Sequence, residues 1–142
     1  MTKKIVITGG LGYIGTELCK IYSGISWNNE ILVIDNRFVS ERVNQLRNWD
    51  INFVHGDILD KDLVNKYCKD ADIVHHLAGI TDVPRVKSES KDKANAKIKL
   101  VAEEGTQNIL DAISDKCKII FPSTHVVYEG IEKVKNDIRE DE

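Results

Sequence analysis

Three glycines, each three positions from the next, directly follow an apolar run near the start of the chain. The stretch IVITGGLGYIG, residues 5–15, contains them as Gly9, Gly12 and Gly15. Where a strand turns into a helix, such glycines allow a tight turn, close approach of a ligand and close packing of the helix. Unpaired amides at the helix start suit a pyrophosphate. The spacing predicts a pyrophosphate-binding turn, although glycine-rich turns also occur for structural reasons; the absence of a following Gly-Lys-Ser/Thr excludes a P-loop.

An acidic residue ends the second apolar run, EILVID (30–35), twenty residues after Gly15. Asp35 can accept hydrogen bonds from both ribose hydroxyls of an adenosine, and it would repel a 2′-phosphate. This position favours NAD over NADP as the cofactor. Two alternatives stay open: Asp35 could cap the next helix or turn, and Arg37 could reach a phosphate.

Two later stretches carry further candidates. Asp57 in HGDI could take the adenine amino group or serve only as a turn residue or cap. In HHLAG, the small Ala78 and Gly79 would let a cofactor pass close to the backbone. His75 and His76 alternate in direction on a strand, so one is expected in sheet packing and neither is assigned as a ligand.

Five short runs rich in β-branched residues predict strands buried on both faces. They are KIVIT (4–8), EILVID (30–35), INFVHG (51–56), ADIVHHLA (71–78) and KIIFPS (118–123).

Helical spacing separates these runs. In the first helix the expected apolar stripe is Ile14, Leu18, Ile21 and Tyr22, and the longest helix is expected over residues 88–114. Strands that alternate with helical crossovers predict an α/β fold, a doubly wound parallel sheet of the Rossmann type. With right-handed crossovers, the expected order of its five strands is 3-2-1-4-5.

Length and composition fit one domain of a cytoplasmic protein. The chain has 142 residues and a net charge of -3, which gives no reason to expect nucleic acid or a membrane as partner. No apolar run is long enough to span a bilayer. We expect residues 1–128 to form the NAD-binding domain and residues 129–142 to be a charged loop or truncated connection. Neither disulfides nor a metal site is expected from the three cysteines, Cys19, Cys68 and Cys117.

Six motifs, in order, strongly resemble the extended short-chain dehydrogenase/reductase superfamily. They are TGGLGYIG, DN at 35–36, GDI at 56–58, HLAG at 76–79, GTQNIL at 105–110 and PSTHVVY at 122–128. Within it the chain is most similar to the NAD-dependent nucleotide-sugar epimerase/dehydratase group, of which UDP-glucose 4-epimerase is the familiar member. The resemblance covers residues 4–128.

The resemblance implies a set of cofactor-binding residues. The pyrophosphate would lie against Gly9, Gly12, Tyr13, Ile14 and Gly15, the ribose against Asp35 and Asn36, the adenine against Asp57 and Ile58, and the middle of the cofactor against Leu77, Ala78 and Gly79.

The resemblance also implies chemistry. Family members pass a hydride to NAD while a tyrosinate takes the hydroxyl proton, assisted by a Ser/Thr hydroxyl and a lysine. Thr124 matches the Ser/Thr position, and Tyr128 matches a tyrosine that is not catalytic. His125 and Val126 replace the Asp-Glu pair of dehydratases, which favours epimerisation or a related sugar redox step. Ala102 replaces a common Asn, which puts some hydrogen bonding of the active site in doubt.

The catalytic Tyr-x-x-x-Lys pair of the family does not occur in the sequence: Tyr13, Tyr22, Tyr67 and Tyr128 are followed at the fourth place by Glu, Ser, Ala and Glu. We therefore expect the NAD(H)-binding portion of a nucleotide-sugar epimerase-type oxidoreductase, inactive by itself. Its expected partners are a nucleotide-sugar substrate in the complete enzyme and a second copy or a complementing C-terminal chain. A free-standing, non-catalytic dinucleotide-binding or regulatory module stays open as the alternative, as does an interaction subunit that no longer binds a cofactor.

Overall fold

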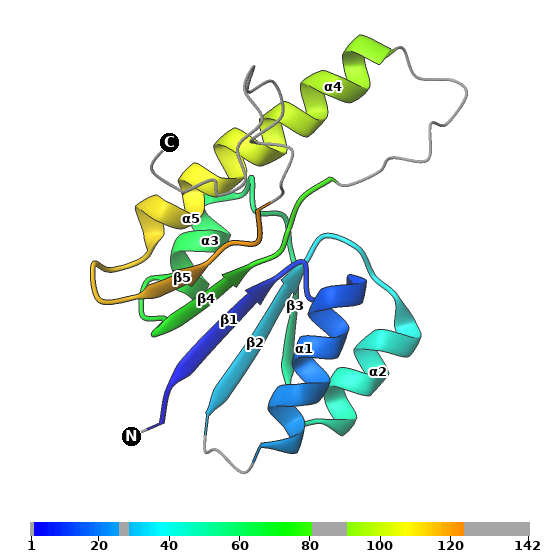
Figure 1. Cartoon of the computed structure of the whole chain (residues 1–142), viewed down its shortest axis with the longest axis vertical. Coiled ribbons are helices and arrows are strands. Elements are labelled where there is room, and N and C mark those ends of the chain that lie inside the picture. Colours follow the sequence, from blue (N-terminus) through cyan, green and yellow to red (C-terminus); the bar gives the residue numbers. More distant parts are fainter. Residues whose placement is uncertain (1, 26–28, 81–90, 124–142) are drawn as a thin grey trace, which may run out of the picture.

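A five-stranded parallel sheet forms the centre of the computed structural model, which describes residues 2–25, 29–80 and 91–123 (Figure 1). Its order is β3-β2-β1-β4-β5, and each neighbouring pair is parallel. The predicted Rossmann fold and strand order are confirmed. The strands are β1 (Lys4–Thr8), β2 (Glu30–Asp35), β3 (Asn52–His55), β4 (Ile73–His76) and β5 (Lys118–Ile120).

Helices cover both faces of the sheet (Figure 1). One face carries α1 (Tyr13–Gly24) and α2 (Ser40–Asn48), and the other carries α3 (Lys61–Cys68) and α5 (Thr106–Ala112). In place of one helix over 88–114, α4 (Lys91–Leu100) runs into a π-helical turn, η1 (Val101–Gly105), and then into α5. A Cβ at Gly105 would lie 2.4 Å from Cδ1 of Ile58, so glycine permits the close approach of this turn to the loop after β3.

Because side chains alternate in direction along each strand, the sheet has an apolar core on each of its two faces. Ile5 and Ile7 of β1 lie in the core beneath α1 and α2, whereas Val6 between them lies in the core beneath α3 and α5. Strands that are buried on both faces need apolar residues at successive positions, which is why these runs lack polar alternation.

The apolar stripe predicted for α1 is partly wrong. Ile14 and Ile21 are 67% and 59% exposed, whereas the buried positions of the helix are Gly15 and Cys19. A Cβ at residue 15 would lie 2.6 Å from Cα of Gly10, so the face that bears Gly15 packs against residues 9–12 between β1 and α1, the glycine turn. This contact turns the two isoleucines toward solvent.

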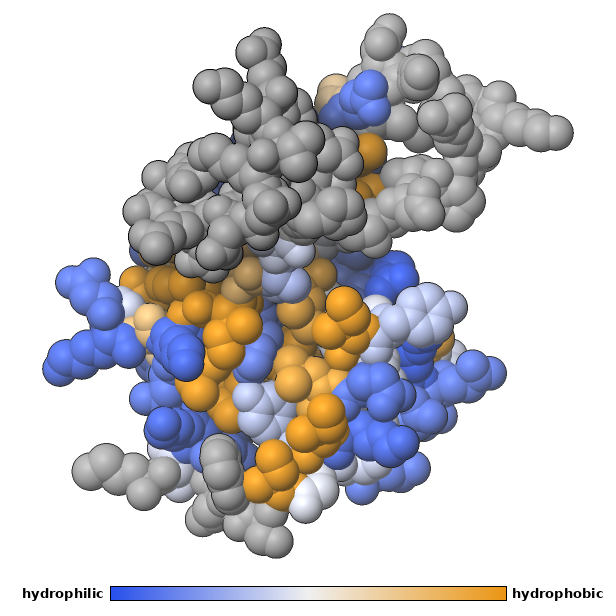
Figure 2. Space-filling view, viewed as in Figure 1, coloured by the Kyte–Doolittle hydropathy of each residue, from blue (hydrophilic) through white to orange (hydrophobic). Residues whose placement is uncertain are grey.

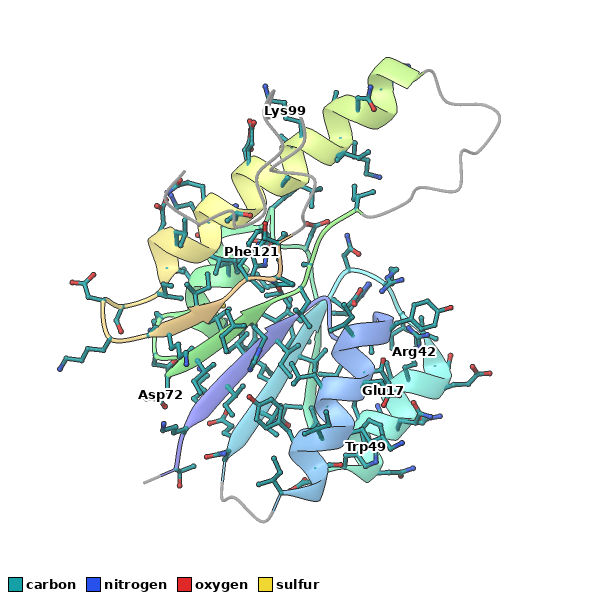
Figure 3. All side chains as sticks on the ribbon, viewed as in Figure 1. Glu17, Arg42, Trp49, Asp72, Lys99 and Phe121 are labelled. Carbon is teal, nitrogen blue, oxygen red and sulfur yellow. The ribbon has the colours of Figure 1, made fainter. Side chains whose placement is uncertain are left out.

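The outward side of α1 is correspondingly apolar. Figure 2 shows apolar side chains gathered across the face of the molecule on which α1 lies. A shallow hollow there is lined by Tyr13, Ile14, Glu17, Leu18 and Ile21, and Glu17 is labelled in Figure 3.

Cys19 and Cys68 are buried and Cys117 is half-buried, and all three are free thiols. In the described part of the chain, no helix has the length and apolarity to cross a membrane. Within the same residues no cluster of side chains suited to a metal ion is found. The boundary predicted at residue 128 and the tail 129–142 lie outside the described residues.

Candidate functional site

The glycine turn is held between two strands by backbone contacts. Gly9 has φ +70°, and its amide donates to the carbonyl of Ile34 at 2.8 Å. The amide of Gly12 donates to the Gly9 carbonyl at 3.0 Å. A Cβ at Gly9 would lie 2.8 Å from the backbone of Ala78, so a side chain fits neither the conformation nor the space.

Helix α1 begins at this turn without a side-chain cap. Its N-cap residue is Gly12, in extended conformation with φ -74° and ψ 175°. The amides of the first helical residues, which include Tyr13 and Ile14, have no acceptor within a helix. Together with the helix dipole, they make the start of α1 suitable for an anion.

Two arginines lie beside the turn. Arg42 of α2 donates to the carbonyl of Leu11, and its guanidinium lies 5.1 Å from the ring centroid of Tyr13 (Figure 3). Arg37 lies closer to Gly12, with Nη2 3.8 Å from the position of a Cβ there. Both positive charges therefore lie at the glycine-rich end of α1.

The carboxylate of Asp35 lies beneath the turn and is only 5% exposed. Oδ2 accepts from the Leu11 amide at 3.0 Å, and Oδ1 accepts from the Arg37 amide at 2.9 Å. Nε of Arg37 also donates to Oδ1, at 3.3 Å. The alternative that Asp35 serves a turn is thus realised, since this carboxylate stabilises both the glycine turn and the turn after β2.

Asn36 and Asp57 are brought together at the ends of β2 and β3. Nδ2 of Asn36 donates to Oδ2 of Asp57 at 2.9 Å, and Oδ1 of Asp57 accepts from the Leu59 amide at 3.0 Å. Asp57 therefore has a turn role. Ile58 is buried in the core beneath α3 and α5, so its side chain lies away from these polar groups, and its carbonyl accepts from Asn108 at 3.0 Å.

The segment after β4 lies under the glycine turn. The amide of Leu77 donates to the Thr8 carbonyl at 3.1 Å, and the amide of Ala78 donates to the Thr8 hydroxyl oxygen at 3.2 Å. A Cβ at Gly79 would meet nothing within 4 Å, so the structure leaves open space at this residue. The predicted residues 77–79 therefore adjoin the predicted residues 9–15.

Buried polar groups that the sequence did not predict lie beneath this segment. Nδ1 of His76 lies 2.8 Å from Oγ1 of Thr8, and Nε2 lies 3.0 Å from Oγ1 of Thr106. Burial lowers the pKa of His76, which favours the neutral ring. Thr8 and His76 are paired in register at the ends of β1 and β4. The predicted strand order makes these strands neighbours, but the predicted run 71–78 extends past His76 and does not give this pairing.

His75 faces the opposite side of the sheet, as alternation predicts. Its Nε2 lies 2.7 Å from the hydroxyl of Tyr22 on α1. Burial, and to a smaller extent the charge of Lys118, lowers the pKa of His75, and burial raises the pKa of Tyr22. This pair attaches α1 to β4.

The end of β5 reaches the site through Phe121, whose ring centroid lies 5.5 Å from that of His76 (Figure 3). Phe121 is 58% exposed, so an aromatic surface flanks the buried imidazole. Thr124, the predicted catalytic residue, lies outside the described residues.

Two curated relatives are named for reactions of sugar nucleotides. CDP-paratose 2-epimerase of Salmonella typhi is 32% identical over an alignment of 144 residues, gaps included, that covers 93% of this chain and 40% of that protein. UDP-N-acetyl-alpha-D-glucosaminuronate decarboxylase of Bacillus cytotoxicus is 30% identical over 130 residues, covering 90% of this chain and 38% of that protein. The chain thus spans about two fifths of the length of these relatives.

A solved structure shares the fold over nearly the whole chain. UDP-glucose 4-epimerase from Brucella ovis, in complex with NAD, has a TM-score of 0.73 and 28% identity, covering 99% of this chain and 41% of that one. The resemblance to the nucleotide-sugar epimerase/dehydratase group is confirmed. The family model described as 3-beta hydroxysteroid dehydrogenase/isomerase matches residues 6–142, nearly the entire sequence, and the protein belongs to that family.

Proposed function

We propose that this chain is the NAD(H)-binding portion of a nucleotide-sugar epimerase-type oxidoreductase. The observation that carries the proposal is the glycine turn, where side chains at residues 9 and 15 would collide with backbone. The adjoining start of α1 has no side-chain cap. A turn with glycine at residues 9, 10 and 12 that leads into uncapped amides fits a pyrophosphate.

In this proposal, different residues of the chain bind different parts of the cofactor. The amides at the start of α1 hold the pyrophosphate, Asp35 and Asn36 take the ribose hydroxyls, and Asp57 takes the adenine edge. The backbone at Leu77, Ala78 and Gly79 lies along the middle of the cofactor. Bound here, NAD would supply hydride transfer to and from the substrate in the complete enzyme. Ile58 supports the adenine end through packing, since its side chain is in the core.

The proposed substrate class is nucleotide sugars, because the relatives at 30% and 32% identity are named for CDP- and UDP-sugar reactions. Thr124 is the proposed hydroxyl that assists proton transfer, on the strength of the PSTHVVY motif. His125 and Val126, in place of an acidic pair, favour epimerisation over dehydration.

Cofactor binding, rather than turnover, is the activity that we propose for these 142 residues, because they contain no Tyr-x-x-x-Lys pair to accept the proton. A second copy or a complementing C-terminal chain is the proposed partner, and a cytoplasmic location is part of the proposal.

Calorimetric titration with NAD tests the function. We expect binding between the micromolar and sub-millimolar range, weakened about tenfold or more in Asp35→Asn by loss of charge-assisted hydrogen bonds. Asp115→Asn removes an equal charge from the loop before β5, at the opposite end of the strands, and should bind like wild type. Folded protein that binds no NAD would contradict the proposal.

A further inference from the structure

The carboxylate of Asp35 already has four N–H donors. The amides of Leu11 and Arg37 donate at 3.0 and 2.9 Å, and the side chain of Arg37 adds Nε at 3.3 Å and Nη2 at 3.5 Å. A carboxylate offers about four acceptor sites. A ribose hydroxyl can therefore bind Asp35 fully only where it replaces one of these donors.

Only the side-chain donors can leave without unfolding a turn. The two backbone amides are fixed, because the Leu11 amide belongs to the glycine turn and the Arg37 amide closes a turn on Asp35. The side chain of Arg37 is 58% exposed, compared with 4% for that of Asp35, and its two hydrogen bonds are the longest of the four. Arg37 is consequently the displaceable group.

The Arg37 guanidinium lies beside the start of α1, where the proposed function places the pyrophosphate. Its Nη2 lies 3.8 Å from the position of a Cβ at Gly12, next to the start of α1. The planar fork of an arginine binds phosphate oxygens in bidentate fashion. The positive charge of Arg37 also offsets the negative charge of Asp35, so this site is not the isolated carboxylate that would repel a 2′-phosphate.

We propose that Arg37 determines cofactor specificity: it competes with the ribose for Asp35 and, once displaced, binds a 2′-phosphate, so that the chain accepts NADP as well as NAD. This inference rests on the proposed function. NAD then binds less tightly than the carboxylate alone would allow, because the ion pair between Asp35 and Arg37 must open first. NADP gains a charge-assisted contact that NAD lacks.

Calorimetric titration of the 142-residue chain with NAD and with NADP tests the proposal. The measured quantity is the ratio of the two dissociation constants, Kd for NADP over Kd for NAD. In Arg37→Leu this ratio should rise about tenfold or more, the effect of one charge-assisted hydrogen bond. Arg37→Lys, which keeps the charge without the fork, should give an intermediate ratio.

Arg47→Leu is the matched control, because it removes the same charge from an exposed position in the last turn of α2. Its ratio should equal that of wild type. An unchanged ratio in Arg37→Leu, with NAD still bound, would overturn the role of Arg37 and leave the proposed function standing. Failure of the folded wild-type chain and every variant to bind either dinucleotide would overturn the proposed function and this inference with it.

Discussion

The hydroxyl of Thr8 and Nδ1 of His76 lie 2.8 Å apart at the ends of adjacent strands, both buried. The same hydroxyl oxygen accepts from the Ala78 amide, and the other ring nitrogen of His76 lies 3.0 Å from Oγ1 of Thr106. In the neutral tautomer that carries its proton on Nε2, Nδ1 accepts from the Thr8 hydroxyl and Nε2 donates to Thr106, whereas a ring protonated at both nitrogens would force both hydroxyls to accept and leave the Thr8 proton unpaired. The backbone at Ala78, beneath the glycine turn, thus depends on a neutral histidine.

Acidification should destabilise the protein through its buried histidines. Burial holds the pKa of His75 and of His76 below the ordinary value of 6.5. The unfolded chain therefore binds more protons than the folded chain, and the free energy of unfolding falls as pH drops below about 6.5. One such histidine contributes at most about 1.4 kcal/mol per pH unit.

Urea unfolding between pH 8 and pH 5 measures this dependence. His76→Gln should have a shallower dependence of stability on pH than wild type, whatever its stability at pH 8. An identical dependence in wild type and His76→Gln would contradict a neutral buried His76.

Gly9→Ala should destabilise the fold strongly. The new Cβ would meet the Ala78 backbone at 2.8 Å, and the residue would keep a φ of +70°. Strain and overpacking together should lower the free energy of unfolding by about 2 to 4 kcal/mol. Gly24→Ala is the matched control, since its Cβ meets nothing within 4 Å and alanine favours the helix. Chemical denaturation compares the two, and equal stabilities would argue against the tight turn.

Two isoleucines, one in the core beneath α1 and one on the outward side of that helix, should differ widely in their contribution to stability. Ile7→Ala empties a fully buried position in β1 and should cost about 2 to 5 kcal/mol of unfolding free energy. Ile21→Ala, on the exposed side of α1, should cost less than about 0.5 kcal/mol. Chemical denaturation measures the free energy of unfolding of both variants. A large loss in Ile21→Ala would mean that α1 turns that side toward the sheet.

The difference between Ile7 and Ile21 separates what the sequence predicts from what it does not. The strands and their order follow from apolar runs and βα alternation, and the glycine turn follows from spacing. The orientation of α1 does not, because the stripes through Ile14 and through Gly15 are offset by one residue, about 100° around a helix. The close approach of Gly15 to Gly10 decides between them, and glycine does not register as a core residue in a hydrophobic pattern.

The site was predictable to a similar degree. Individual positions such as Asp35 could be picked out by their distance from the glycines along the chain. The hydrogen-bond donors to the Asp35 carboxylate could not be predicted from the sequence. The Leu11 amide and the Arg37 side chain reach it only because two turns adopt particular conformations. The hydrogen-bond partners of His76 likewise come from two elements far from it in sequence, β1 and α5.

The thiols should react in the order of their burial. Burial raises the pKa of Cys19 to about 12 and that of Cys68 to about 11, and Cys117, although its pKa is also raised, is only half-buried. Because the thiolate is the reactive form, Ellman's reagent at pH 8 should modify Cys117 first in the native protein. Cys117→Ser should remove this first phase, and all three thiols should become reactive in guanidinium chloride. Equal rates for the three native thiols would show that α1 and α3 open readily, because Cys19 and Cys68 are accessible only when these helices leave the sheet.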